Sequence, residues 1–128
     1  MDISCAIYAY IMVSILNQNE DIFELVLDDK VVLTHDTNRY RFRLPNKNDV
    51  LGLPIGKHLS LITLNMEGEQ VSRSYTPVST DKNPGYVDFV IKIYKKNQHP
   101  DFPDGGFMSQ KIDELNIGES FKFKGPNG

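Results

Sequence analysis

From residue 22 onward the chain is a succession of short β-type runs, and turn residues separate each run from the next. The cleanest run covers residues 39–44, in which Tyr40, Phe42 and Leu44 alternate with three arginines. Successive side chains of a strand point to opposite faces, so this alternation predicts a half-buried strand. Because strand-like runs do not alternate with helical segments, a parallel sheet is not expected.

The remaining runs extend this pattern over most of the chain. The expected strands cover residues 23–34, with a break at Asp28-Asp29, and residues 39–44, 57–65, 70–76, 86–95 and 119–124. Within residues 107–115, Met108, Ile112 and Leu115 form one apolar stripe at helical spacing, which predicts a helix. Short antiparallel strands with one helix predict an all-β fold built on a small barrel.

Composition narrows the classes of function. The chain has 128 residues, 40% of them hydrophobic and 24% charged, as is typical of one globular domain. A net charge of −3 argues against a broadly basic surface, so no nucleic-acid partner is expected. With one cysteine, no internal disulfide or cysteine-rich zinc site can form. The three histidines lack metal-ligand spacing, so no metal site is expected.

Residues 3–16 contain no charged side chain. As a helix, these fourteen residues would extend roughly 21 Å, less than the roughly 30 Å hydrocarbon core of a bilayer. Three interpretations stay open: a short or clipped membrane anchor, a buried helix packed on the domain, and an artefact of gene assignment. We therefore expect a hydrophobic N-terminal segment, residues 1–19, followed by a barrel domain, residues 20–128.

The run from residue 71 to residue 77 carries the first candidate binding pair. On a strand, Arg73 and Tyr75 point to the same face, roughly 6.6 Å apart. A guanidinium donates paired hydrogen bonds to a phosphate, and a phenol ring offers a flat surface for stacking. The pair suits a ligand with a planar ring near a phosphate. The alternative is an ordinary strand with one surface arginine and one half-buried tyrosine.

A second candidate is the glycine turn before the expected helix. Gly105 and Gly106 would let a phosphate approach the backbone, and the free N–H groups of a first helical turn attract anions. Ser109 would add a hydroxyl donor. The alternative is a plain turn in which Asp104 caps the helix.

Two further residues have weaker signals. Lys92 lies on the strand face opposite Ile91 and Ile93, together with Asp88, Val90 and Tyr94, and a solvated face is its simplest interpretation. His58, at a strand start, is more typical of a structural histidine than of a catalyst. No carboxylate pair, Gly-x-Ser-x-Gly, phosphate-loop or HExxH pattern points to another chemistry.

Taken together, these segments resemble a known family. Arg73-Ser74-Tyr75-Thr76-Pro77-Val78-Ser79 is similar to the flavin signature of the ferredoxin-reductase-type flavoproteins, and most of all to that of the NADH–cytochrome b5 reductases. Supporting segments follow in order along the chain: residues 52–58, 90–94, 99–103, 105–109 and 117–128. The likeness covers roughly residues 22–128, and it favours the functional interpretations above over the ordinary ones.

The resemblance implies a six-stranded antiparallel Greek-key barrel that is capped by a helix and binds FAD. It implies catalytic roles for Thr76, near the flavin N5, and for His58, which would support that hydrogen-bond network. Arg73 would grip the pyrophosphate, and Tyr75 would lie against the flavin and ribityl chain. The other implied cofactor-binding residues are Ser74, Val90, Lys92, Phe107, Met108 and Ser109.

The resemblance also implies partners and a location. Its members take a hydride from NADH onto FAD and pass electrons to cytochrome b5 or a similar haem protein. They often carry a hydrophobic anchor that leaves the catalytic part facing the cytosol, on the endoplasmic reticulum or the mitochondrial outer membrane. Without such an anchor, a cytoplasmic location is expected.

Three departures from the family pattern are visible. Ser74 replaces a common proline, and Phe107 stands where a lysine is common. The NADH-binding domain that follows the barrel in family members is absent from these 128 residues. Two alternatives therefore stay open: a truncated, non-catalytic flavin- or nucleotide-binding barrel, and the flavin domain of a nitrate-reductase-like enzyme.

Overall fold

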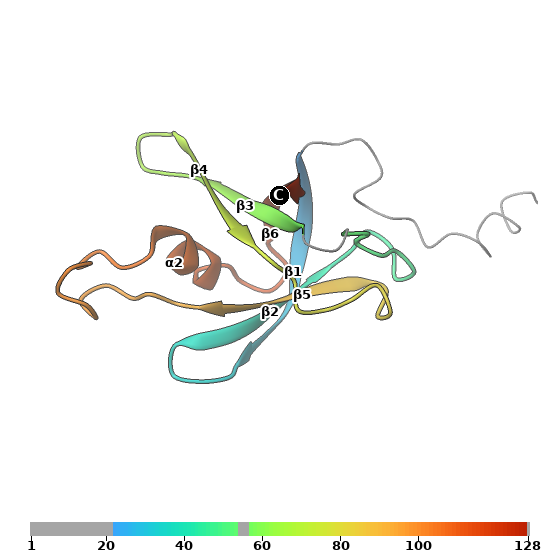
Figure 1. Ribbon diagram of the computed structural model, residues 1–128, viewed down its shortest axis with the longest axis horizontal. Coiled ribbons are helices and arrows are strands. Elements are labelled where there is room, and N and C mark those ends of the chain that lie inside the picture. Colours follow the sequence, from blue (N-terminus) through green and yellow to red (C-terminus); the bar gives the residue numbers. More distant parts are fainter. Residues whose placement is uncertain (1–21, 54–56, 128) are drawn as a thin grey trace, which may run out of the picture.

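The computed structural model describes residues 22–53 and 57–127 (Figure 1). Its elements are β1 (Ile22–Val32), β2 (Thr37–Arg43), β3 (His58–Leu64), β4 (Gln70–Tyr75), β5 (Tyr86–Lys92), α2 (Phe107–Asp113) and β6 (Ser120–Asn127). The hydrophobic N-terminal segment lies outside the described residues. Among the residues that are described, no helix combines the length and apolar character needed to cross a bilayer.

The strands form one six-stranded sheet in the order β4-β3-β6-β1-β2-β5, and every pairing in it is antiparallel. Its two edge strands, β4 and β5, approach each other after β4 ends, where the Val78 N–H donates to the Asp88 carbonyl at 2.9 Å. The sheet thus curls into a barrel, and α2 lies at one end of it (Figure 1). The prediction of an all-β antiparallel Greek-key barrel with one helix is confirmed.

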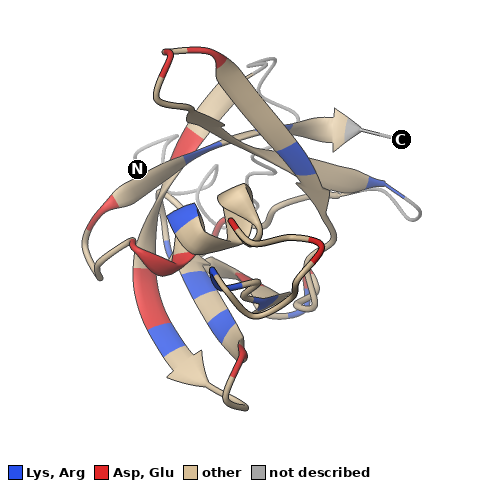
Figure 2. Cartoon of the chain, turned by 90° about the vertical axis from the view of Figure 1, so that its left-hand side faces the viewer, with Lys and Arg blue, Asp and Glu red and all other residues tan. Residues whose placement is uncertain are grey.

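Strand β2 shows how the alternating sequence builds the sheet. Tyr40 and Phe42 are fully buried, whereas the three arginines that alternate with them face outward and pair with aspartates on neighbouring strands. Figure 2 shows acidic and basic segments side by side on adjacent strands. The expected break at Asp28-Asp29 is an irregularity in the register between Leu27 and Asp29, and β1 continues through it.

Aromatic rings fill the barrel interior around Phe123. Its ring centroid lies 5.0 Å from that of Phe42, 5.9 Å from Phe89 and 5.8 Å from Phe23. These rings come from strands β1, β2, β5 and β6, so one side chain joins most of the sheet. Edge-to-face and offset ring pairs add stability beyond the area that they bury.

Helix α2 is attached to the barrel by an apolar stripe and a polar cluster. Met108 and Ile112 are buried, as the helical spacing predicted, although the helix ends at Asp113 rather than at residue 115. The Asp113 carboxylate accepts hydrogen bonds from the Tyr40 hydroxyl at 2.9 Å and from Asn38 at 3.1 Å. It also pairs with the Lys30 ammonium at 2.7 Å, so three polar side chains of β1 and β2 hold the last turn of the helix.

This polar cluster predicts a pH dependence of stability. Burial alone would raise the pKa of Asp113, but the hydrogen bonds from Lys30 and Tyr40 and the charges of Lys30 and Lys95 together outweigh burial and hold this pKa below its ordinary value of 3.8. Because the pKa of Asp113 is lower in the folded state than in the unfolded state, its carboxylate stabilises the fold fully at pH values above 3.8. This stabilisation is lost as the pH falls through the folded-state pKa. Asp113→Asn is expected to lower the free energy of unfolding by roughly 1–2 kcal/mol near pH 7.

Urea denaturation between about pH 6 and about pH 2 measures this difference. The Asp113→Asn variant should lose less stability than the wild type over the acid range. Asp101→Asn serves as the control, because the Asp101 side chain is 80% exposed. Equal acid slopes in the wild type and the Asp113 variant would contradict the prediction.

Candidate functional site

Arg73 lies on the edge strand β4, opposite Leu61 of β3. Its side chain is exposed, and its guanidinium donates to the Ser72 carbonyl at 2.7 Å. Within the described ranges 22–53 and 57–127, Arg73 makes no ion pair with a carboxylate. Arginines 39, 41 and 43 of β2, in contrast, each pair with an aspartate. Arg73 is therefore a positive charge that the surrounding fold does not neutralise.

Tyr75 ends β4, half-buried against the barrel core. Burial raises the pKa of its hydroxyl, and the nearby Arg73 cation opposes this shift only in part. The nearby Tyr94 hydroxyl, just beyond the end of β5, also raises the pKa of Tyr75. Arg73 and Tyr75 of β4 therefore lie near the end of β5, where the two edge strands close the barrel.

Strand β5 contributes an exposed row on the same side. Val90 is 44% exposed and Tyr94 is 58% exposed, and Lys92 lies between them. The Lys92 ammonium is 3.7 Å from the Asp36 carboxylate, so part of its charge is already balanced. The interpretation of this face as solvated is wrong for Asp88, which is buried and pairs with Arg41.

The glycine turn before α2 packs closely against the end of β5. The Gly106 N–H donates to the Tyr94 carbonyl at 2.7 Å, and a Cβ at Gly105 would collide with that same oxygen. Gly105 also has a φ of +71°, which glycine adopts without strain. The helix is capped at Gly106 without a side-chain hydrogen bond, so the alternative that Asp104 is the cap is wrong.

The other predicted residues of α2 differ in what they expose. Phe107 is 37% exposed, whereas the Met108 side chain is buried in the core. The buried Ser109 hydroxyl accepts from the Tyr94 N–H at 3.1 Å and donates to the Gly106 carbonyl at 3.3 Å. Ser109 therefore fixes the turn between β5 and α2, and its contact with a phosphate stays a prediction.

His58 and Thr76 lie at one end of the β3–β4 ladder. Leu59 pairs with Tyr75, so the residues just beyond this pair on the two strands are His58 and Thr76. His58 is half-buried, and Thr76 and Ser74 are exposed. The structure thus brings the two predicted catalytic residues to the same end as Tyr75.

A pocket of about 380 Å³ lies beside Tyr94, and of its lining residues sequence reasoning had identified only Gly105 and Gly106 as a candidate site. It is lined by Tyr94, Lys95, Gln98, His99, Phe102, Gly105 and Gly106. Its aromatic walls come from Tyr94, near the start of the loop between β5 and α2, and from His99 and Phe102, farther along the same loop. The signal in the sequence was the presence of two aromatic residues, Tyr94 and Phe102, within this proline-containing loop. Such a pocket suits a flat, largely apolar ring system.

Comparison with known proteins agrees with this geometry. The model of the family described as oxidoreductase FAD-binding domain matches residues 24–128. NADH-cytochrome b5 reductase 3 of Rattus norvegicus is 51% identical over 112 residues, which are 87% of this chain and 37% of the rat protein. NADH-cytochrome b5 reductase 1 of Homo sapiens is 49% identical over 116 residues, which are 91% of this chain and 37% of the human protein.

A solved structure extends the likeness to three dimensions. The cytochrome b5 reductase domain of Ulva prolifera nitrate reductase superimposes with a TM-score of 0.83 and 39% identity, covering 91% of this chain and 44% of that chain. This chain spans a little over a third of the length of the rat and human relatives, 37% of each. The chain belongs to the oxidoreductase FAD-binding domain family, and its relatives include NADH–cytochrome b5 reductases.

Proposed function

We propose that this chain is the FAD-binding part of an NADH–cytochrome b5 reductase-like oxidoreductase. The observation that carries the proposal is the set of groups at the closure of β4 and β5. This set comprises Arg73, which makes no ion pair within the described residues, the half-buried ring of Tyr75 and an apolar pocket of about 380 Å³. A dinucleotide needs a cation for its diphosphate and flat apolar surfaces for its rings, so the residues present fit FAD.

Each predicted site residue has a role in this proposal. Arg73 holds the diphosphate, and Tyr75 lies against the flavin end, with Ser74 beside them on β4. Thr76 donates a hydrogen bond near the reacting edge of the ring, and His58 supports it. The remaining contacts come from Val90 and Lys92 of β5 and from the turn that leads into Phe107, Met108 and Ser109. The apolar pocket beside Tyr94 receives the adenine.

FAD, when bound, supplies the redox chemistry: it accepts a hydride and releases electrons one at a time. In the proposed reaction NADH is the donor, and cytochrome b5 or a similar haem protein is the acceptor. The protein's part is to hold the cofactor, to exclude water from one face of it and to keep the donor groups in place. The test uses FAD-loaded chain that has been reduced with dithionite and then freed of excess dithionite. Mixed with oxidised cytochrome b5 in a stopped-flow spectrometer, this chain supports the proposal if the haem is reduced and contradicts it if the haem stays oxidised.

A second candidate is the flavin domain of a nitrate-reductase-like enzyme. The likeness to the reductase domain of the Ulva prolifera nitrate reductase favours it. In that case electrons pass to a haem domain of a larger chain rather than to a separate cytochrome b5. Transfer to the isolated haem domain of a nitrate reductase that is much faster than transfer to cytochrome b5 supports this candidate over the first.

These 128 residues alone are expected to show weak or absent turnover with NADH. The chain spans only 37% of the rat reductase's length, and it contains no Gly-x-Gly-x-x-Gly segment between a strand and a helix, the usual dinucleotide-binding turn. NADH-dependent ferricyanide reduction measures this directly. FAD-loaded chain that has been reduced with dithionite and freed of the excess is the positive control for ferricyanide as acceptor. Robust turnover with NADH would contradict the expectation.

We further propose that residues 1–19 attach the barrel domain, residues 20–128, to a cytosol-facing membrane, namely the endoplasmic reticulum or the mitochondrial outer membrane. The uncharged run at residues 3–16 supports this proposal. Flotation with lipid vesicles is expected for the whole chain and not for a chain that starts at residue 20. Equal behaviour of the two chains would favour the cytoplasmic alternative.

A further inference from the structure

The segment that follows β4 crosses from one edge of the sheet to the other. Its first anchor is the pairing of Tyr75 with Leu59 of β3. Its second anchor lies on β5, where the Val78 N–H donates to the Asp88 carbonyl at 2.9 Å and the Ser79 hydroxyl accepts from the Asp88 N–H at 2.8 Å. Thr76 and Pro77 lie between the two anchors.

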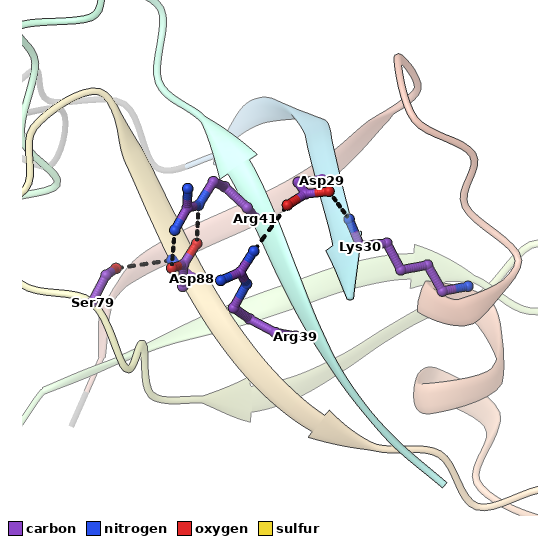
Figure 3. A network of polar contacts seen from close by, with 6 residues as sticks. All are labelled: Asp29, Lys30, Arg39, Arg41, Ser79 and Asp88. Carbon is purple, nitrogen blue, oxygen red and sulfur yellow. Dashed lines mark hydrogen bonds and ion pairs between the residues drawn. The ribbon is translucent and has the colours of Figure 1, made fainter. Parts of the chain in front are cut away.

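Asp88, the residue that holds the second anchor, is itself fixed by β2. Its buried carboxylate accepts two hydrogen bonds from Arg41, from Nε at 2.8 Å and from Nη2 at 2.9 Å (Figure 3). The Arg41 guanidinium also lies over the Tyr86 ring, 3.8 Å from its centroid. A forked, charge-assisted pair of this kind has a specific geometry, so the position of Asp88 on β5 is well defined.

The chain between the anchors has little conformational freedom of its own. The ring of Pro77 fixes its φ angle, and the residue before a proline, here Thr76, is restricted to extended conformations. With both ends of this short bridge hydrogen-bonded, the positions of Tyr75 and Thr76 depend on the second anchor as well as on the β3–β4 ladder. Groups that are held before a ligand arrives bind it with a smaller entropic cost.

We propose that Ser79, Asp88 and Arg41 are positioning residues of the FAD site. They act through the bridge: Arg41 orients Asp88, Asp88 holds Val78 and Ser79, and this fixes Tyr75 and Thr76 where they meet the cofactor. None of the three needs to touch FAD. The inference rests on the proposed function, because it assigns a task to residues outside the binding surface of that same site.

The test compares Ser79→Ala with Ser79→Thr in the whole 128-residue chain. Alanine removes the acceptor of the Asp88 N–H, whereas threonine keeps it, and the cavity of about 260 Å³ beside Ser79 leaves room for the added methyl. Ser120→Ala is the matched control, because that serine is exposed at the start of β6. Asp88→Asn is a second variant, which weakens the link to Arg41 without changing the backbone.

Three quantities are measured: FAD affinity by flavin fluorescence titration well below each melting temperature, visible circular dichroism of the bound flavin at saturation, and hydrogen exchange of the Asp88 amide. Ser79→Ala and Asp88→Asn are expected to weaken FAD binding about 5- to 10-fold and to change the visible spectrum. In Ser79→Ala the Asp88 amide should also exchange faster. Ser79→Thr should restore all three quantities, and Ser120→Ala should leave them unchanged.

The outcomes separate this inference from the function that it rests on. If the wild-type chain binds FAD and Ser79→Ala binds it equally well with the same visible spectrum, the positioning role is overturned. The proposed function then stays intact. A lower melting temperature in Ser79→Ala with no change in FAD affinity or in the visible spectrum also overturns the positioning role. Folded wild-type chain that does not bind FAD overturns both. If Asp88→Asn does not fold, the Ser79 pair decides alone.

Discussion

Replacing Arg73 by alanine is expected to weaken FAD binding roughly 10- to 100-fold. A hydrogen bond to a charged group contributes about 1.5–3 kcal/mol, and each 1.4 kcal/mol is about a tenfold change in affinity. Arg73 makes no ion pair within the described part of the chain, so its loss removes attraction for an anion without freeing a carboxylate. Isothermal titration of FAD into refolded, cofactor-free chain gives the affinity of each variant.

Two other cations provide the comparison. Lys92→Ala should have the smaller effect, because the Asp36 carboxylate, 3.7 Å from the Lys92 ammonium, already balances part of that charge. Arg43→Ala should have almost none, because Arg43 pairs with Asp28 on another part of the sheet. A larger loss of affinity in Lys92→Ala than in Arg73→Ala would refute the assignment of Arg73 to the diphosphate.

Phe123→Ala is expected to lower the free energy of unfolding by about 3–5 kcal/mol, which is the range for removing a buried phenylalanine. The Phe123 side chain is fully buried, and its ring contacts rings on three other strands. The cavity would lie at the centre of the barrel, where the sheet has little room to collapse. For a domain of this size, the loss is a large fraction of the whole stability.

Urea denaturation followed by circular dichroism measures this loss. Phe102→Ala is the matched control, because Phe102 is 68% exposed and should change the free energy of unfolding by less than about 0.5 kcal/mol. Phe102 also lines the pocket beside Tyr94, so the same control is expected to bind FAD more weakly while it remains folded. A loss below about 1 kcal/mol in Phe123→Ala would contradict this account of the core.

Local patterns in the sequence were enough to predict the barrel and most of its strands. The alternation of Tyr40 and Phe42 with arginines identifies the buried face of β2, because a strand has a period of two. The spacing of Met108 and Ile112 identifies the buried side of α2 in the same way. The candidate site was found through its signature on β4, in which the arginine and the tyrosine share one short run.

Pairings between distant segments could not be predicted. Nothing in the local sequence indicates that Asp88 is buried, because its partner, Arg41, is 47 positions away along the chain and only the register of β2 with β5 brings them together. Tyr40 and Asp113 are a second case, since a helix that follows the barrel reaches back to β2. The pocket beside Tyr94 was missed for a similar reason, because a cavity depends on how the loop before α2 folds over β5.

Binding of FAD is the central claim, and a titration of the folded, cofactor-free chain with FAD and with riboflavin tests it most directly. Riboflavin carries the flavin ring but neither the diphosphate nor the adenine. One FAD is expected to bind per chain, with an affinity at least about tenfold higher than that for riboflavin, because only FAD carries the diphosphate and the adenine that Arg73 and the pocket beside Tyr94 are proposed to bind. Folded chain that binds no FAD, or that binds FAD no better than riboflavin, would contradict it.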